Sequence, residues 1–293
     1  MAATVPVEID ELLGQAHWID RLAVPVQQIV RRLFAGPTGL KARNILNGVW
    51  LGHPLHAALT DLPVGAYTLG ILLDYLGLLR ADRHLQRTAD LATGAGWLGA
   101  LAAAAAGLAD YSVLEDEPRR VGLTHGALNV LGVLAYTGSM RERLAGRRAT
   151  AVALATVGYA LIFTAAELGG QLVYHLGTLV NRQAWNRGPA EFTPVLPAAA
   201  LGEGELRSVE VGGFPVLLTR VSGRVYALGN TCTHWGCRLD QGHLEGTSII
   251  CHCHGSQFDL RTGAVINGPA TAPEVSFDVR ERDGRIEVCA RPY

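Results

Sequence analysis

Charged residues are scarce in this sequence. They make up 17% of its 293 residues, against about 25% in an average soluble chain. The shortage is uneven, because long apolar runs fill residues 62–166, whereas residues 201–293 have an ordinary soluble composition. An excess of one sign is also lacking. With 25 basic and 26 acidic residues, the chain has no electrostatic footprint for nucleic acid, and we expect no such partner.

We expect no cleavable signal peptide either. Met1–Glu11 has neither a basic start nor an apolar core. One of the later apolar runs must therefore direct insertion into a membrane.

Four apolar runs have the length of membrane-spanning helices. They are Leu62–Leu79, Leu91–Ala109, Val121–Met140 and Ala149–Ala166. A spanning helix needs about 20 apolar residues, and a helix buried in a soluble bundle normally keeps a polar face. Only Asp74 brings a charge into any of the runs. We predict an all-α, four-helix transmembrane bundle over residues 52–180, with the lipid bilayer as a partner.

The segments on either side of this bundle have a different character. Residues 1–51 are expected to form an amphipathic or interfacial segment, because Leu22–Phe34 combines apolar residues at helical spacing with Arg31 and Arg32, and Arg21 directly precedes it. This helix either lies on the membrane surface or is simply solvated. Residues 181–200 contain three prolines and little periodicity, which is typical of a linker.

The C-terminal part has the pattern of a small all-β domain, residues 201–293. Short apolar runs alternate with turn pairs such as Gly212-Gly213, Ser222-Gly223 and Asp283-Gly284. The whole chain is therefore expected to be a multidomain membrane protein with a helical and a β domain.

Within the β domain, four of the chain's five cysteines and two histidines lie close together in sequence. Cys232-x-His234 is followed after sixteen residues by Cys251-x-x-His254, with Cys237 and Cys253 beside them. From the residue types alone, a zinc site, a disulfide staple and an iron–sulfur cluster remain as alternatives.

These motifs closely resemble the Rieske family. The matching segments are CTHWGC (Cys232–Cys237), CHCHGS (Cys251–Ser256) and GPA (Gly268–Ala270), and the resemblance covers Leu201–Tyr293. It implies a [2Fe-2S] cluster with Cys232 and Cys251 as thiolate ligands and His234 and His254 as imidazole ligands. Zinc would use the same ligand types but would not account for the flanking Cys237, Cys253 and Ser256.

The resemblance also assigns the neighbouring residues. It implies a disulfide between Cys237 and Cys253, as in the Rieske domains of quinol-oxidising complexes. Ser256 matches the serine whose hydroxyl donates to a bridging sulfide, and Pro269 belongs to the third motif. Phe258 stands where high-potential members carry a tyrosine that donates to a ligand thiolate. Hydrogen bonds to cluster sulfurs raise the potential, so we expect a potential below that of the high-potential members.

The helical part carries a second group of candidate residues. His53, His56, His125 and His175 lie near the ends of the apolar runs that an up-and-down bundle brings to one side, the side from which the β domain follows. The surrounding segments HPLHAALTDLPVG, GLADY, HGALN and ELGGQLVYHLG resemble domain-of-unknown-function family 2231, which brings no established activity. The histidines are expected to hold haem b, to line a quinone pocket, or to serve only the structure.

The positions of the basic residues predict the orientation. The loops after the first and third runs carry seven arginines, whereas the loop after the second carries two beside three acidic residues. Cytoplasmic loops are enriched in Lys and Arg, so the β domain is expected to be extracytoplasmic. Five basic residues before residue 44 oppose this orientation.

The expected function is electron transfer. A membrane-anchored Rieske protein would relay electrons between a membrane redox cofactor or quinone and a redox partner. The alternatives are an anchored Rieske ferredoxin, whose helices serve only as anchor and docking surface, and a subunit of a quinol oxidoreductase. In the last case the chain would be part of an enzyme.

Overall fold

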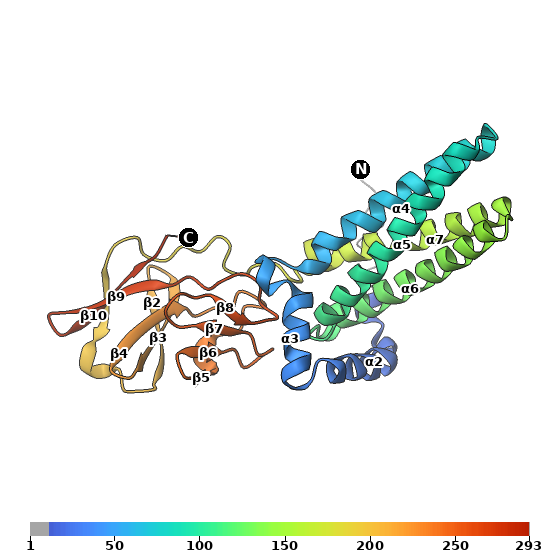
Figure 1. Cartoon of the computed structure of the whole chain (residues 1–293). Helices are drawn as coiled ribbons and strands as arrows, with labels where there is room; N and C mark the ends of the chain where they lie inside the picture. Colours follow the sequence, from blue (N-terminus) through green and yellow to red (C-terminus); the bar gives the residue numbers. More distant parts are fainter. Residues whose placement is uncertain (1–11, 293) are drawn as a thin grey trace, which may run out of the picture. The chain divides into compact units, whose positions relative to one another are not determined.

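The computed structural model describes residues 12–292, which form two compact units (Figure 1). The helical unit contains the described residues up to Ala35 together with Leu55–Thr178, and the β unit contains Gly36–Pro54 and the chain from Leu179 onward. Met1–Glu11, where the sequence predicts no signal peptide, lies outside the described residues.

Long helices dominate the helical unit. They are α2 (Asp20–Leu33), α4 (Leu55–Leu79), α5 (Arg83–Tyr111), α6 (Asp116–Leu144) and α7 (Arg148–Gly170), which continues as the π turn Gln171–His175. The start of α5 is set locally, because the Asp82 carboxylate accepts the backbone N–H groups of His84 (2.7 Å) and Leu85 (3.3 Å). Such an N-cap satisfies donors that have no partner within the helix.

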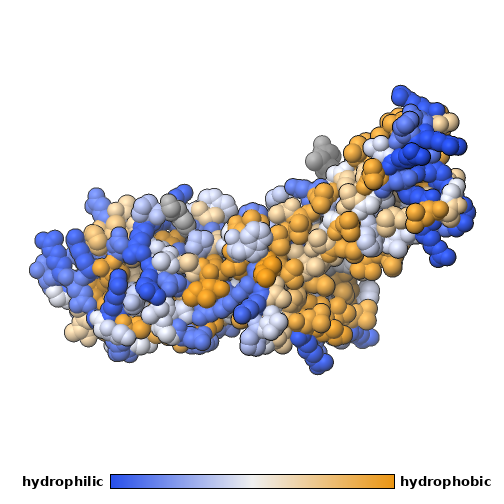
Figure 2. All heavy atoms as spheres, viewed as in Figure 1, coloured by the Kyte–Doolittle hydropathy of each residue, from blue (hydrophilic) through white to orange (hydrophobic). Residues whose placement is uncertain are grey.

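Within residues 12–292, three helices are apolar and long enough to cross a membrane: α4, α5, and α7 with its π turn. Figure 2 shows apolar side chains over this unit and hydrophilic residues gathered near the α4–α5 and α6–α7 turns. The predicted run Val121–Met140 is helical within α6, but polar residues inside the run, among them His125 and Asn129, lower its apolar character. The all-α character is therefore confirmed, and a fourth span remains a prediction.

Helix α2 packs inward through Ala23, Gln27 and Val30. The buried Gln27 side chain donates to the carbonyl groups of Tyr111 (2.9 Å) and Leu114 (2.6 Å). Leu22, Ile29 and Leu33 are each about 60% exposed. The amphipathic pattern thus yields an apolar row that faces away from the other described residues of the helical unit.

The β unit contains three small antiparallel sheets. Their strand orders are β1-β10-β9, β2-β3-β4 and β5-β6-β7-β8. The strands are β1 (Thr193–Pro197), β2 (Leu206–Val211), β3 (Phe214–Val221), β4 (Arg224–Gly229), β5 (His243–Glu245), β6 (Ser248–Ile250), β7 (Gln257–Asp259), β8 (Val265–Asn267), β9 (Phe277–Arg282) and β10 (Arg285–Ala290).

Strand β3 lies between the two apolar cores of this unit. Val216 and Leu218 belong to one core, and Leu217 belongs to the other. Successive side chains of a strand point to opposite faces, so one continuous apolar run contributes to both cores. The second core also contains Cys232, Cys251 and Phe258, so the candidate ligand loops are anchored in this core.

Two segments differ from the expected domain layout. Part of the expected linker, residues 181–200, forms β1, which pairs with β10 at the edge of its sheet. An edge position tolerates its two prolines, because an edge strand leaves one side unpaired. In addition, α3 (Gly36–Asn47) and the turn Val49–Leu51, which were expected to belong to the N-terminal segment, group with the β unit.

Candidate metal centre

Two loops of the β unit carry the predicted ligands, and their backbones follow the same path. In the first loop, Cys232 N–H donates to Cys237 C=O and Gly236 N–H donates back to Cys232 C=O, both at 2.8 Å. In the second, Cys251 N–H donates to Ser256 C=O (2.8 Å) and Gly255 N–H to Cys251 C=O (3.0 Å).

A glycine permits each of these tight loops. Gly236 and Gly255 have φ values of +81° and +76°, a region that residues with a Cβ rarely adopt. The Cys-x-His and Cys-x-x-His spacings therefore place each ligand pair on one short, hydrogen-bonded loop.

The two loops bring all four predicted ligands together. Cys232 and Cys251 are 1% and 2% exposed, and their thiol groups are hydrogen-bonded to each other. The imidazole rings of His234 and His254 lie 5.0 Å apart between centroids, at 83°. The group thus combines a pair of buried thiols with a pair of imidazoles.

The protonation states of these side chains suit a metal centre. The hydrogen bond from Cys232 lowers the pKa of Cys251 to about 6, and backbone N–H groups of Cys253 and His254 contribute to the same shift. The same thiol pair, followed by burial, raises the pKa of Cys232. A bound metal ion would displace the shared proton, because cysteine ligates as the thiolate.

His234 has the environment that most strongly favours a role as a metal ligand. Both of its ring nitrogens are buried and have no hydrogen-bond partner among the residues that the structure describes. Burial in the first place, then His254 and the guanidinium groups of Arg182 and Arg43, lower the pKa of His234 to about 3. A buried polar group without a partner is costly, whereas a neutral imidazole is the form that binds a metal. The residues present fit an iron–sulfur centre with two thiolate and two imidazole ligands.

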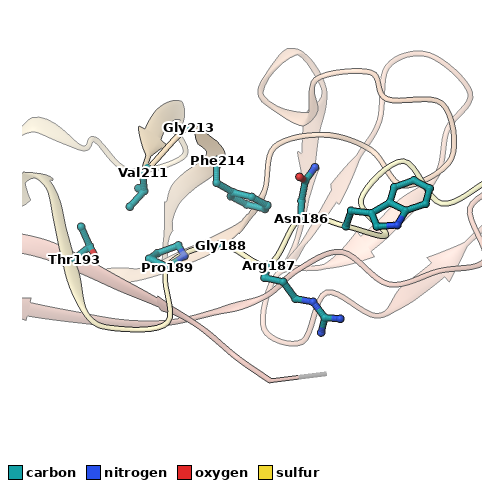
Figure 3. Close-up of a pocket in the computed structure, with 10 residues that line it drawn as sticks. Asn186, Arg187, Gly188, Pro189, Thr193, Val211, Gly213 and Phe214 are labelled. Atoms are coloured by element: carbon teal, nitrogen blue, oxygen red, sulfur yellow. The ribbon is translucent and has the colours of Figure 1, made fainter.

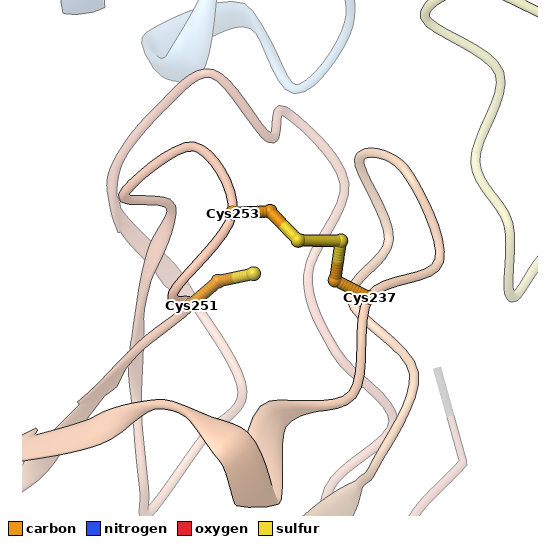
Figure 4. A group of neighbouring side chains, drawn as sticks. All are labelled: Cys237, Cys251 and Cys253. Carbon is orange, nitrogen blue, oxygen red and sulfur yellow. A yellow bond between two sulfur atoms is a disulfide. The ribbon is translucent and has the colours of Figure 1, made fainter.

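A disulfide joins the two loops. Cys237 and Cys253 are bonded, and Figure 4 shows the Cys251 side chain directed toward this bond. The sulfur atoms of the three cysteines lie within 4.8 Å of one another. Since the disulfide removes two thiols from ligation, Cys232 and Cys251 remain as the thiolate candidates of the loops.

Comparisons with known proteins agree with this geometry. Residues 191–281 match the family described as "Rieske [2Fe-2S] domain", and residues 52–182 match "Predicted membrane protein (DUF2231)". The ferredoxin component of the naphthalene 1,2-dioxygenase/salicylate 5-hydroxylase systems of Ralstonia sp is 36% identical over 84 residues, which are 29% of this chain and 81% of that protein. The chain belongs to the Rieske [2Fe-2S] family.

Two further relatives match the same part of this Rieske protein. Ferredoxin CarAc of Metapseudomonas resinovorans is 36% identical over 95 residues, 32% of this chain and 89% of its own length. The solved ferredoxin of carbazole 1,9a-dioxygenase from Nocardioides aromaticivorans IC177 is 30% identical and covers 34% of this chain and 98% of its own, with a TM-score of 0.33.

The residues that the Rieske resemblance assigns to tuning surround the ligand loops. Ser256 is fully buried, and its oxygen accepts the backbone N–H of Ala270 (3.0 Å). Its own hydroxyl hydrogen therefore remains available to donate. Pro269 is buried beside Ala270. Phe258 is 0% exposed and shares its apolar core with both candidate thiolates.

Exchange of Phe258 for tyrosine is expected to raise the midpoint potential of the Rieske centre. A phenol at this position would add a donor close to a ligand sulfur, and such outer hydrogen bonds change potentials by amounts on the order of tens of millivolts. A redox titration followed by electron paramagnetic resonance measures the shift. Phe214→Tyr is the matched control, because Phe214 belongs to the other apolar core. An unchanged or lower potential in Phe258→Tyr would refute the hydrogen-bond argument.

The N-terminal helix α3 supports the third Rieske motif, which the sequence did not predict. The Asn44 side chain donates to Asn267 Oδ1 (2.7 Å) and accepts Gly268 N–H (3.0 Å), while Arg43 donates to Gly268 C=O (3.3 Å). A Cβ at Gly268 would lie 3.1 Å from a methyl group of Val49. More than 200 residues separate these partners, so no local sequence signal indicates their contact.

Another support behind the first ligand loop is Glu274. This side chain is 2% exposed, and its Oε1 accepts the backbone N–H of Thr233 (2.7 Å), the residue between Cys232 and His234. Burial raises the pKa of Glu274 well above its usual value. Arg182 donates its backbone N–H to Thr233 C=O (3.0 Å), so the loop is held from two sides.

The four membrane histidines fall into two groups. His56 and His125 lie inside the helical unit with ring centroids 6.2 Å apart. His53 belongs to the β unit and is exposed, and His175 is exposed at the end of the π turn. Of the four predicted histidines, the structure thus brings the rings of His56 and His125 together.

An open groove of about 450 Å³ lies elsewhere on the β unit (Figure 3). It is lined by Trp185–Pro189, Thr193 and Val211–Phe214. None of the candidate ligands lines it, and it forms no part of the metal centre.

Proposed function

We propose that this protein is a membrane-anchored Rieske electron-transfer protein, with Cys232, His234, Cys251 and His254 as the ligands of a [2Fe-2S] cluster. The observation that carries this proposal is the buried His234 imidazole, whose two nitrogens have no hydrogen-bond partner among the described residues. When bound, the cluster supplies a one-electron redox couple.

The surrounding residues hold the ligands in place. Glu274 and Arg182 fix the backbone of Thr233 in the first loop. The Cys237–Cys253 disulfide ties this loop to the second one. Asn44 fixes the third motif through Gly268. Because these contacts restrain the ligand loops, the loops are expected to move little when the charge of the site changes on oxidation or reduction.

The second ligand loop is the side from which we expect a redox partner to approach. His252 and Cys253 are exposed and His254 is partly exposed, whereas His234 is 4% exposed. Curated relatives are named as ferredoxin components of dioxygenase systems, which supports a protein partner at this surface. A quinone is the alternative occupant.

The helical unit is proposed to span the membrane with α4, α5, α6 and α7. Helix α6 has 29 residues, long enough to span a bilayer at about 1.5 Å per residue. Some of its polar residues in the span form hydrogen bonds inside the unit; the Ser139 hydroxyl, for example, donates to Ala151 C=O (2.7 Å). Val130, Leu131 and Leu134 are more than half exposed, as expected of a face in contact with lipid.

Helix α2 is proposed to lie at the membrane surface. Its exposed apolar row of Leu22, Ile29 and Leu33 has no partner in the described part of the helical unit. An amphipathic helix with such a row binds the boundary between headgroups and acyl chains. The disulfide and the arginine-rich turns support an extracytoplasmic β unit.

A second candidate function is an anchored ferredoxin whose helices only attach it to the membrane. The relatives named as ferredoxins favour it. In the relay proposal, by contrast, the helical unit also holds haem or quinone and exchanges electrons with the Rieske centre.

Spectroscopy of the full-length protein tests the proposal. Membranes washed with carbonate should retain the chain, and the reduced detergent extract should give the electron paramagnetic resonance signal of a cluster with mixed histidine and cysteine ligands. Two iron atoms per chain are expected from this site. A zinc-bound protein without that signal, or full-length protein in the soluble fraction, would overturn it.

A further inference from the structure

The helical unit contains an internal repeat. Helices α4 and α6 share a series in which a tyrosine follows a histidine by eleven residues and a charged residue follows seven later: His56, Tyr67 and Asp74 in α4, and His125, Tyr136 and Arg143 in α6. These spacings correspond to nearly whole numbers of helical turns. Each series therefore lies on one face of its helix.

The structure pairs each member of one series with its equivalent in the other. The rings of Tyr67 and Tyr136 stack with centroids 3.7 Å apart and planes within 10°. Asp74 forms an ion pair with Arg143, and His56 lies opposite His125. When equivalent residues of two repeats contact each other, the repeats are related by a two-fold axis that passes between those residues. The axis runs along the unit, between α4 and α6.

The flanking helices obey the same symmetry. His56 Nδ1 lies 2.8 Å from Ala103 C=O in α5, and His125 Nδ1 lies 2.7 Å from Ala165 C=O in α7. Glycine faces each ring: a Cβ at Gly107 would lie 3.0 Å from His56, and a Cβ at Gly169 would lie 3.2 Å from His125.

Hydrogen bonds between the two helix pairs repeat as well. Trp97 of α5 donates to Thr137 of α6 (2.9 Å), and Tyr159 of α7 bonds Thr68 of α4 (3.1 Å). The pair α4–α5 therefore recurs as α6–α7, which makes His56 and His125 equivalent positions of one symmetric site.

The contacts of the two histidines determine their tautomers. A backbone carbonyl only accepts, so each Nδ1 carries the hydrogen and each Nε2 has a lone pair that can bind a metal. At His125 this lone pair accepts a hydrogen bond from the Asn129 amide nitrogen (3.2 Å), which a metal bond would replace. Anchoring of Nδ1 by a carbonyl is how proteins orient metal-binding imidazoles.

The spacing of the two rings suits one metal between them. With metal–nitrogen bonds of about 2 Å, two imidazoles on opposite sides of one ion have centroids about 6 Å apart. The observed separation is 6.2 Å.

The number of protein ligands then distinguishes haem from a bare ion. Among the described residues, a cluster of three or more metal-binding side chains occurs at the loop cysteines and not here. A bare ion needs about four protein ligands, whereas haem iron brings four nitrogen atoms of its own and needs only axial ligands. We propose that His56 and His125 are the two axial ligands of one haem on this axis, an inference that rests on the proposed electron-transfer function.

The test uses the full-length protein, expressed with a haem precursor and purified in detergent. The expected result is about one haem per chain by pyridine haemochrome assay, in addition to the Rieske signal. His56→Ala and His125→Ala should each lose the haem band and keep the Rieske signal. His53→Ala and His175→Ala are matched controls that should keep both. His125→Met retains an axial donor and should keep haem with a shifted spectrum.

The outcomes separate this inference from the proposed function. Wild-type protein with a Rieske signal and no haem would overturn the haem site and leave the Rieske function intact. A transition metal bound at this site without porphyrin would also overturn it. Loss of haem in His175→Ala but not in His125→Ala would refute the assignment of the pair. Absence of the Rieske signal from the wild type would instead refute the proposed function.

Discussion

Replacement of His234 by cysteine, or of Cys251 by serine, is expected to abolish the electron paramagnetic resonance signal of the Rieske centre. The spectrum of this cluster depends on one iron with two imidazoles and one with two thiolates. No spare thiol is available in the ligand loops, because Cys237 and Cys253 form a disulfide. We therefore expect complete loss of the native signal in either variant.

Two surface substitutions serve as controls for this experiment. Cys289 lies in β10, where its thiol donates to Ala190 C=O (3.2 Å), and His243 is exposed in β5. Cys289→Ser and His243→Ala should keep the signal. An unchanged signal in His234→Cys would show that this imidazole is not a ligand.

The ligand variants should also lose stability. Metal binding contributes to folding free energy because the unfolded chain does not hold the site. The unit would then keep a buried His234 or Cys232 with no metal to satisfy it. Thermal unfolding followed by circular dichroism should show a lower midpoint for the β unit in Cys251→Ser than in Cys289→Ser.

Replacement of Asp74 by asparagine is expected to cause the largest loss of stability in the helical unit. Asp74 is 0% exposed and forms ion pairs with both Arg143 and Arg148. Removing one partner of a buried ion pair typically costs about 3–5 kcal/mol, because it leaves the other charge uncompensated. The guanidinium groups of Arg143 and Arg148, whose side chains are 5% and 16% exposed, would then share a single carboxylate, that of Asp90.

Asp90→Asn is the matched control for this prediction. Asp90 contacts the same two arginines, but its side chain is 41% exposed. Water can therefore replace part of the lost interaction, and exposed pairs contribute about 0–1 kcal/mol. Unfolding of the detergent-solubilised protein, followed by circular dichroism, measures both variants. An equal effect of the two substitutions would contradict the role assigned to burial.

The repeat in the helical unit is present in the sequence as a set of equal intervals between polar residues. The intervals from His56 to Tyr67 and from His125 to Tyr136 are identical, and the repeat is the signal that singles out these histidines. Scanning for apolar runs misses it, because hydropathy is averaged over many residues, whereas the repeat consists of a few polar positions.

The local signals in the β unit predicted its turns correctly. The dipeptide Gly212-Gly213 adopts positive φ values between β2 and β3. Gly236 and Gly255 do the same in the loops that carry the candidate ligands. Glycine adopts positive φ values because it has no Cβ. Its presence in the sequence therefore indicates a tight turn without knowledge of distant contacts.

The sequence by itself therefore determined the helical and β character of the two parts, the Rieske motifs, and the residues that approach one another within each short loop. Only the tertiary structure decided which side of α2 is buried, that α3 supports the third motif through Asn44, and that His56 rather than His53 faces His125. Helical periodicity and turn chemistry act over a few residues. Contacts between residues more than 60 positions apart depend instead on which packed arrangement buries the most apolar surface while satisfying its polar groups.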